Sequence, residues 1–502
     1  MQEILDTFSY SLSAFLTFEY ILILIIGVFI GIIAGALPGM GSMVTLTLIL
    51  PFTFTWDPIP SFILMSAIMG STTVGGGITA ILINAPGTDS NIATTLDGYP
   101  MTKKGRAVEA LGIMSSASLF GSLMGLVLLF ILLPFLMVVS LAFGPPEIFW
   151  LGIFTLVILS TVTGGSVLMN FLIGGLGFLF AMIGMDPAVG SLRFTFDIDY
   201  LRGGIELIPA LVGTFAISEM INIYVNNNVS FTGNVTVKGS RLKSLKSLVE
   251  NRFLLIRSTI IGFIIGVIPG VGGTVANYLA YGHAVQSAKD KENFGKGDPR
   301  GVLAPESSNN AKDLGQLVPT FALGIPGSGT MAIFLGALIL HGFTPGPSLM
   351  NNHLDTVGII IIAFAFAFMA SCLLVFFFGH LIVPFLRINV NIMISIILTI
   401  CFIAIYVTRF QIIDTLVMLL FGILAYIIMK LKGSRILLIL PLILGPIIEN
   451  NFMLAKQISR GNNMIFLEGA VSITIILITV LSFLYPLYKK LRQSKSKSNK
   501  EV

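Results

Sequence analysis

Long apolar runs fill most of the sequence between Tyr20 and Tyr488, and glycines, prolines and short polar clusters interrupt them. A helix of about 20 apolar residues is long enough to cross the hydrocarbon core of a bilayer. By this measure the 502 residues hold on the order of ten to thirteen membrane segments. The pattern therefore predicts an all-α polytopic membrane protein.

The composition excludes the main soluble classes. Hydrophobic residues make up 55% of the chain and charged residues 11%, whereas an ordinary soluble domain has about 25% charged residues. The net charge of +5 does not indicate nucleic-acid binding, because the basic residues lie in short loops and in the tail after Tyr488. A basic tail beside a final apolar run is typical of a cytoplasmic end.

Two long polar stretches, residues 226–257 and 289–313, separate the apolar runs. We interpret the first as a linker and the second as a large loop. The predicted organisation is therefore a first membrane repeat (residues 1–225), a basic cytoplasmic linker (226–257), a second membrane repeat (258–488) and a basic cytoplasmic tail (489–502).

The two predicted repeats share two motifs. The sequence Gly-Ile-Ile-Ala-Gly-Ala-Leu-Pro-Gly-Met-Gly over residues 31–41 reappears as Gly-Phe-Ile-Ile-Gly-Val-Ile-Pro-Gly-Val-Gly over residues 262–272. Asn-Ala-Pro-Gly-Thr over 84–88 likewise matches Gly-Ile-Pro-Gly-Ser over 324–328. Repeats with Pro-Gly breaks at matching places are typical of secondary transporters.

Charges near the motifs indicate how each repeat is oriented. The first motif of the first half has no Lys or Arg near it, whereas its twin lies between Arg257 and Lys289. The second pair reverses this, because Lys103 follows the first copy and residues 313–386 around its twin hold no Lys or Arg. Since basic loops stay cytoplasmic, we predict inverted-topology repeats. The segments beside Pro269 are too short to cross alone, which favours re-entrant hairpins with the breaks at their tips.

A Pro-Gly break frees backbone N–H and C=O groups, which a bilayer tolerates only inside the protein or beside a water-filled cavity. A helix N-terminus after the break favours an anion, and free carbonyls favour a cation. The alternative interpretation is that these glycines only allow close helix packing.

Asp89 is either an ion ligand or a helix cap, and residues 306–310 either line the cavity or form a solvated loop. We predict no catalytic residue and no metal ligand, and a substrate and ion site formed by Pro38, Gly39, Gly41, Ser42, Asn84, Pro86, Gly87, Thr88, Asp89, Pro269, Gly270, Gly272, Gly273, Glu306, Asn309, Asn310, Pro326, Gly327, Ser328 and Thr330.

The motifs together resemble the large membrane subunit of the tripartite tricarboxylate transporters, the TctA family. The resemblance rests on the Pro-Gly segments over residues 35–41, 75–87 and 324–328, on Leu-Asp-Gly-Tyr-Pro-Met over 96–101 and on Ala-Pro-Glu-Ser-Ser-Asn-Asn over 304–310. It covers nearly the whole chain and implies that the four breaks and residues 306–310 form the substrate and ion region.

This resemblance implies a permease subunit, not an enzyme, that spans the bacterial plasma (inner) membrane several times with a cytoplasmic C-terminus. It would import small di- or tricarboxylates such as citrate, driven by an ion gradient, with Na+ or H+ as coupling ion and no cofactor. Its expected partners are a small four-helix membrane subunit and an extracytoplasmic solute-binding protein that delivers the carboxylate, in a lipid bilayer and without nucleic acid. Two alternatives stay open: a permease for amino acids or inorganic ions, and an integral membrane enzyme.

Overall fold

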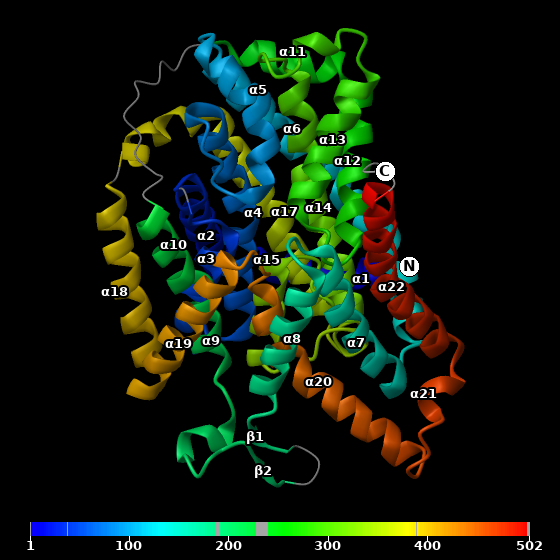
Figure 1. Cartoon of the computed structure of the whole chain (residues 1–502). Coiled ribbons are helices and arrows are strands. Elements are labelled where there is room, and N and C mark those ends of the chain that lie inside the picture. The colour runs from blue at the N-terminus through cyan, green and yellow to red at the C-terminus, as the bar shows by residue number, and fades with distance from the viewer. Residues whose placement is uncertain (1, 38, 187–189, 227–238, 388, 499–502) are drawn as a thin grey trace. The chain divides into compact units, whose positions relative to one another are not determined.

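A computed structural model describes residues 2–37, 39–186, 190–226, 239–387 and 389–498. Nearly all the regular structure in these residues is helical (Figure 1). The α-helices are α1 (Gln2–Phe15), α2 (Phe18–Ala36), α3 (Ser42–Thr53), α4 (Pro58–Ile83), α5 (Ile92–Lys103), α6 (Ala107–Ser140), α7 (Pro145–Val162), α8 (Val167–Ala181), α9 (Leu207–Val212), α10 (Ser218–Asn226), α11 (Arg241–Glu250), α12 (Arg252–Val267), α13 (Gly272–Ser287), α14 (Arg300–Leu323), α15 (Gly329–Leu340), α16 (Pro347–Asn352), α17 (Leu354–Phe378), α18 (Val390–Arg409), α19 (Ile412–Lys430), α20 (Ile436–Ile458), α21 (Ile465–Glu468) and α22 (Ala470–Ser498).

Short 3-10 turns cover Asp89–Asn91, Asp199–Gly203, Lys291–Asn293 and Gly379–Arg387, and a π turn covers Gly213–Ile217. Strands β1 (Gly184–Met185) and β2 (Leu192–Arg193) form a small antiparallel pair. Among the described residues, 9 helical segments are long and apolar enough to cross a membrane. The prediction of an all-α polytopic membrane protein is confirmed.

Contacts group the chain into two compact units, each of which is discontinuous in sequence. Unit 1 combines Met1–Met137 with Phe215–Gln411, and unit 2 combines Val138–Thr214 with Ile412–Val502. Each predicted repeat therefore contributes to both units. The repeat boundaries and their inverted orientation remain predictions.

Close packing of helix pairs builds unit 1. Helix α2 lies along α4, and α12 lies along α14 (Figure 1). Gly31 of α2 lies against Ser71 of α4, where an added Cβ would come within 2.6 Å of the carbonyl oxygen of Ile68. At the matching place in the second motif, a Cβ on Gly262 would lie 2.3 Å from the carbonyl oxygen of Ser308. Small residues that let backbones approach are typical of helix packing in membranes, and Gly31 and Gly262 allow this close approach.

Helices end at each predicted Pro-Gly break. Residues 37–41 separate α2 from α3, and residues 84–88 separate α4 from the turn that leads into α5. In the second half, residues 268–271 separate α12 from α13 and residues 324–328 separate α14 from α15. Helices α12 and α13 have 16 residues each, or about 24 Å at 1.5 Å per residue. Neither arm is long enough to cross the hydrocarbon core of a bilayer, which is about 30 Å thick. The hairpin prediction requires arms of such short length.

The polar stretch over residues 289–313 is not a single large loop, and that prediction was wrong. Its second part belongs to α14, whose residues from Gly301 to Ala322 are all buried. The sequence suggested a loop because polar residues are dense here, but Glu306, Asn310 and Asp313 find partners on other elements of unit 1. The linker region likewise contains a helix, α11, while its residues 227–238 lie outside the described part.

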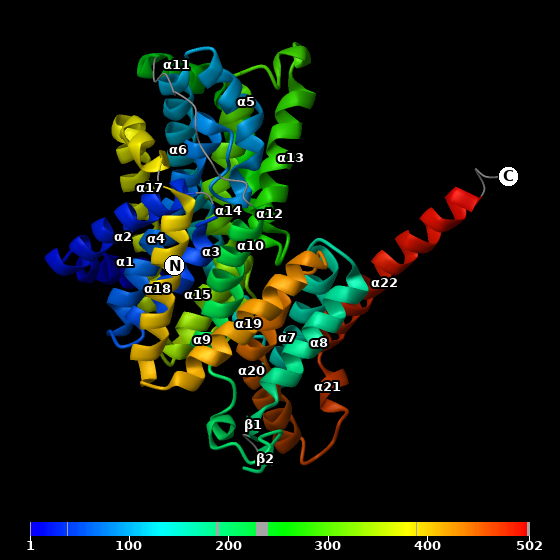
Figure 2. The same ribbon diagram turned by 60° about the vertical axis from the view of Figure 1, so that its left-hand side comes forward.

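In unit 2, helix α20 packs along both α7 and α8 (Figure 2). An aromatic cluster joins α7, α20 and α21 at Phe149, Phe452 and Phe466, where the rings of Phe452 and Phe466 stack with centroids 5.2 Å apart. The guanidinium of Arg193 on β2 forms a bidentate ion pair with the carboxylate of Glu449 of α20, with N–O distances of 2.6 and 3.0 Å. The strand pair is thus attached to α20.

Candidate functional site

Helix α14 brings buried ionisable side chains into the middle of unit 1. Glu306 is 0% exposed, and Lys312 and Asp313 are 5% and 3% exposed. Charged groups are costly to bury, so such residues within a membrane protein are usually paired and functional. This helix is therefore the centre of the candidate site.

Three donors from the first half of the chain surround the carboxylate of Glu306. The Thr94 hydroxyl of α5 and the Asn91 amide donate to Oε1 at 2.5 and 3.2 Å. The Ser118 hydroxyl of α6 donates to Oε2 at 3.1 Å. Hydrogen bonds to an ionised group are stronger than those between neutral groups. They join α5, α6 and the turn before α5 to α14.

Two amides follow Glu306 on the same helix. Asn310 donates to the backbone carbonyl of Ser118 at 3.2 Å and contacts the Cys372 sulfur of α17 at 3.9 Å. Its carbonyl oxygen and that of Asn309 have no hydrogen-bond partner among the described residues, although both side chains are 0% exposed. Buried acceptors normally have partners, so these two oxygens are available to accept a hydrogen bond from a ligand or to coordinate a cation.

Lys312 and Asp313 form an ion pair that the sequence interpretation missed. The Lys312 ammonium lies 2.6 Å from Oδ1 of Asp313, and the Thr73 hydroxyl of α4 donates to Oδ2 at 3.3 Å. A signal was present, because a Lys-Asp pair precedes the apolar segment that leads to Pro326. Classing residues 289–313 together as a loop hid it.

Contacts at or beside the breaks connect them in chain order. A Cβ on Gly87 would lie 1.8 Å from the carbonyl oxygen of Gly35, so the second break touches the end of α2 and no side chain fits there. The hydroxyl of Thr274 donates to the backbone carbonyl of Asp89 at 3.2 Å, which links the second break to the third. The Gly270 amide donates to the carbonyl of Gly327 at 3.2 Å and links the third to the fourth.

The start of α13 is also attached to the turn Asp89–Asn91. The Asn277 amide donates to the carbonyl of Ser90 at 2.6 Å. An added Cβ on Gly273 would lie 2.2 Å from the Ser90 hydroxyl and 2.7 Å from the ammonium of Lys312. The second and third breaks therefore meet beside the buried ion pair.

The predicted residues of the first half have several local roles. Pro38 lies outside the described residues. Gly39 has a φ of 80°, and Gly41 precedes Ser42, the first residue of α3. Asn84 ends α4 with a φ of 57° and is exposed, as is Asp89. Pro86 is half-buried, and the hydroxyl of Thr88 donates to Oδ1 of Asn91 at 2.5 Å, next to Glu306.

The predicted residues of the second half are less exposed at the fourth break than at the third. Pro269, Gly270, Gly272 and Gly273 are half-buried, and Gly270 and Gly272 have φ angles of 77° and 76°. Pro326 and Gly327 are buried and Thr330 is half-buried. The Ser328 hydroxyl caps α15 by accepting from the amide of Met331 at 3.3 Å, which satisfies a donor that a free helix end would offer to a ligand.

Asp97, a second residue that the site prediction omitted, holds the loop between α13 and α14. Its buried carboxylate accepts from the backbone amides of Gly295, Gly297 and Asp298 at 3.1, 2.7 and 2.8 Å. It also accepts from the Tyr281 hydroxyl at 3.0 Å. In the same loop, hydrogen bonds from Arg300 and Asn293 hold the pKa of the Asp290 carboxyl well below its ordinary value.

We expect Asp97→Asn to destabilise this loop. The new amide would turn a donor toward backbone N–H groups, and each buried donor left without a partner costs about 1–3 kcal/mol. Limited proteolysis of the purified protein should cut residues 288–299 faster than in the wild type. Asp57→Asn is the control, because Asp57 is exposed and its side chain makes no cap bond to α4. Equal cleavage rates for both variants would contradict the prediction.

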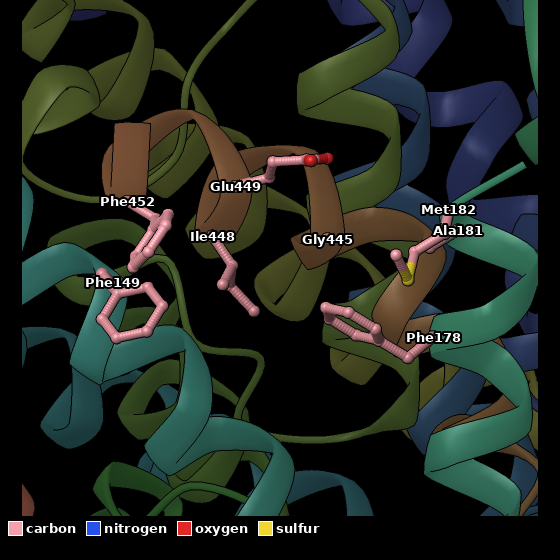
Figure 3. A pocket seen from close by; sticks show the side chains of 8 residues that line it. All are labelled: Phe149, Phe178, Ala181, Met182, Gly445, Ile448, Glu449 and Phe452. Atoms are coloured by element: carbon pink, nitrogen blue, oxygen red, sulfur yellow. The ribbon is translucent and has the colours of Figure 1, made fainter. Parts of the chain in front are cut away.

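A cavity in unit 2 has a different character. It measures about 230 Å³ and is lined by Phe149, Phe178, Ala181, Met182, Gly445, Ile448, Glu449 and Phe452 (Figure 3). Phe149 and Phe452 lie together on one side, and Phe178 and Met182 lie on the other. The carboxylate of Glu449 is already paired with Arg193. This mostly apolar lining makes the cavity a weaker candidate for a carboxylate site than unit 1.

Comparisons with known proteins identify the family of this chain. The chain is 33% identical over 500 residues to an uncharacterized 52.8 kDa protein in the TAR-I ttuC' 3'region of Agrobacterium vitis, covering 99% of each chain. It is 31% identical over 231 residues to an uncharacterized protein in the TAR-II ttuC' 3'region of the same organism, covering 45% of this chain and 94% of that one. No solved structure matches. The model of the tripartite tricarboxylate transporter TctA family matches residues 21–440. The chain belongs to this family.

Proposed function

We propose that this TctA subunit is a permease that imports small di- or tricarboxylates such as citrate, and that it binds them in unit 1 beside α14. The observation that supports this most is the burial of Glu306, Lys312 and Asp313 at the place where the helix breaks meet. Ionisable groups inside a membrane protein commonly line the path of a charged substrate or ion.

The chemistry of the surrounding groups suits an anion and a cation together. The start of α13 presents backbone N–H groups and partial positive charge, as helix N-termini do. Glu306 and the unpaired carbonyl oxygens of Asn309 and Asn310 are oxygen ligands of the kind that cations prefer. We therefore propose that an ion gradient drives import, with Na+ or H+ as the coupling ion.

The arrangement of breaks supports a proposal of alternating access. Broken helices at a substrate site, contributed by two inverted repeats, are the common plan of secondary transporters. We propose that the segments bearing the breaks are re-entrant hairpins and that they move against the long apolar helices. The family description names a tripartite system. The other two components would be a small four-helix membrane subunit and an extracytoplasmic solute-binding protein, with this subunit in the bacterial plasma membrane and its C-terminus cytoplasmic.

The test is uptake of radiolabelled citrate by proteoliposomes that contain this chain and the proposed small membrane subunit. Purified binding protein is added outside or omitted as the control. An imposed Na+ gradient and an imposed pH gradient are compared separately. We expect uptake that requires the binding protein and one of the two gradients, and that unlabelled tartrate or succinate reduces.

Competition identifies the solute class. Inhibition by glutamate or phosphate, with none by tartrate or succinate, would contradict carboxylate import and favour a permease for another solute. Uptake that is the same with and without either gradient would contradict ion coupling.

A further inference from the structure

Lys312 uses little of its capacity to donate hydrogen bonds. An ammonium group carries three donor protons, yet among the described residues the structure gives it one partner, Oδ1 of Asp313 at 2.6 Å. The Asp313 carboxylate is held from its other side by the Thr73 hydroxyl of α4. The acid is therefore fixed, while the cation retains donors for a further acceptor.

The end of the Lys312 side chain lies against the third helix break. An atom at the Cβ position of residue 273 would be 2.5 Å from its Cε and 2.7 Å from its Nζ. A side chain at this position would push the ammonium away from the helix break. The same position is 2.2 Å from the Ser90 hydroxyl, so the ammonium, a hydroxyl and the first turn of α13 lie together.

These groups attract the same kind of ligand. A lysine ammonium binds carboxylates as a point charge, the Ser90 hydroxyl can donate to an anion, and the first amides of α13 carry partial positive charge. Asn277, one turn into α13, is 0% exposed, and its side-chain oxygen has no partner among the described residues. That oxygen can accept from a hydroxyl group, which hydroxy acids such as citrate carry.

We propose that Lys312 is a specificity-determining residue that binds one carboxylate of the substrate, and that Asp313 is its counter-ion when the substrate is absent. A pair of opposite charges is less costly to bury than a lone ammonium, so the unloaded site is stable. The incoming carboxylate takes the free donors of Lys312. This inference deepens the proposed function and rests on it.

The experiment compares citrate and succinate uptake by the complete three-component system. The key variant is Lys312→Gln/Asp313→Asn, which removes both charges together and leaves neither buried alone. Lys312→Arg keeps the positive charge, and Lys289→Gln removes an exposed one. Gly273→Ala keeps both charges, but its methyl group would displace the ammonium. Thermal unfolding in detergent checks that each variant is folded.

We expect the neutral pair to raise the KM for citrate at least tenfold with little change in kcat. Gly273→Ala should raise it as well. Lys312→Arg keeps the positive charge and should raise the KM less than the neutral pair does, whereas Lys289→Gln, outside the site, should stay within about threefold of the wild type. The increase for the neutral pair should be larger for citrate than for succinate, because citrate carries more negative charge. A purely structural ion pair would instead change the stability of the protein and leave the ratio of the KM for citrate to the KM for succinate as it is in the wild type.

The outcomes separate this inference from the proposed function. The wild type takes up citrate in the first outcome, and the neutral pair and Gly273→Ala both have the wild-type KM for citrate. In that case Lys312 does not bind the substrate, so the inference is wrong while the proposed function stands. If the neutral pair fails to fold, Gly273→Ala alone decides. A wild type that neither takes up citrate or succinate nor is thermally stabilised by them overturns both.

Discussion

Replacement of Asp313 by alanine is expected to reduce the free energy of unfolding by about 3–5 kcal/mol, the cost of leaving a buried charge without its partner. Asp313 is the partner that the structure gives to the ammonium of Lys312, and both side chains are less than a tenth exposed. The substitution also leaves the Thr73 hydroxyl without its carboxylate. Unfolding of the purified protein in mixed micelles, with increasing SDS, measures the change.

The matched control removes the cation as well. Lys312→Met/Asp313→Ala buries no unpaired charge, and methionine replaces the lysine stem with a similar volume. We expect this double variant to recover most of the lost stability, because apolar replacements of a buried ion pair are often neutral. An Asp313→Ala protein as stable as the wild type would show that water reaches Lys312 and that the pair is not buried.

The sequence predicted the places where helices end in unit 1 because those places have a local cause. Proline lacks a backbone donor and glycine tolerates left-handed φ angles, so residues 84–88 and 268–271 carry a local cause for the ends of their helices. The small-residue spacing of Gly31 and Gly35 is equally local, and it marks the face of α2 that meets α4.

Partners distant in sequence could not be predicted in this way. Glu306 accepts from Thr94, which is 212 residues away, and Asp97 accepts from Gly297, which is 200 residues away. Neither pair has a shared spacing or motif that would mark it. Residues 300–313 were consequently interpreted as part of a loop, although a polar helix is stable in the interior when other elements supply its hydrogen bonds.

The division into two units could not be predicted from the sequence either, because each unit is assembled from two separate stretches. Unit 1 combines residues 1–137 with 215–411, which lie on either side of residues 138–214 of unit 2. Helix α6 reads as one continuous apolar run, yet the boundary between the units falls after Met137. Hydrophobicity shows which segments enter the bilayer. It does not show which segments pack together, because lipid and helix interiors are similarly apolar.

Glu306→Leu is expected to cost at least about 3 kcal/mol of stability, because three buried donors lose their acceptor and each unsatisfied donor costs about 1–3 kcal/mol. The donors are Asn91, Thr94 and Ser118, and they come from separate elements of the first half. The variant should therefore loosen α5 and α6 from α14. Hydrogen exchange in detergent, read at residues 91–118, measures this loosening. The SDS concentration at the midpoint of unfolding measures the loss of stability.

Glu306→Gln distinguishes the hydrogen bonds from the charge. The glutamine carbonyl can still accept from Thr94 and Asn91, and the Ser118 hydroxyl can turn to accept from the new amide. We expect near wild-type exchange and stability for this variant. Citrate uptake should nevertheless fall at least tenfold if the carboxylate binds the coupling ion, as we propose. Full uptake by Glu306→Gln would limit Glu306 to a structural role, and wild-type exchange in Glu306→Leu would contradict its place at the centre of this hydrogen-bond network.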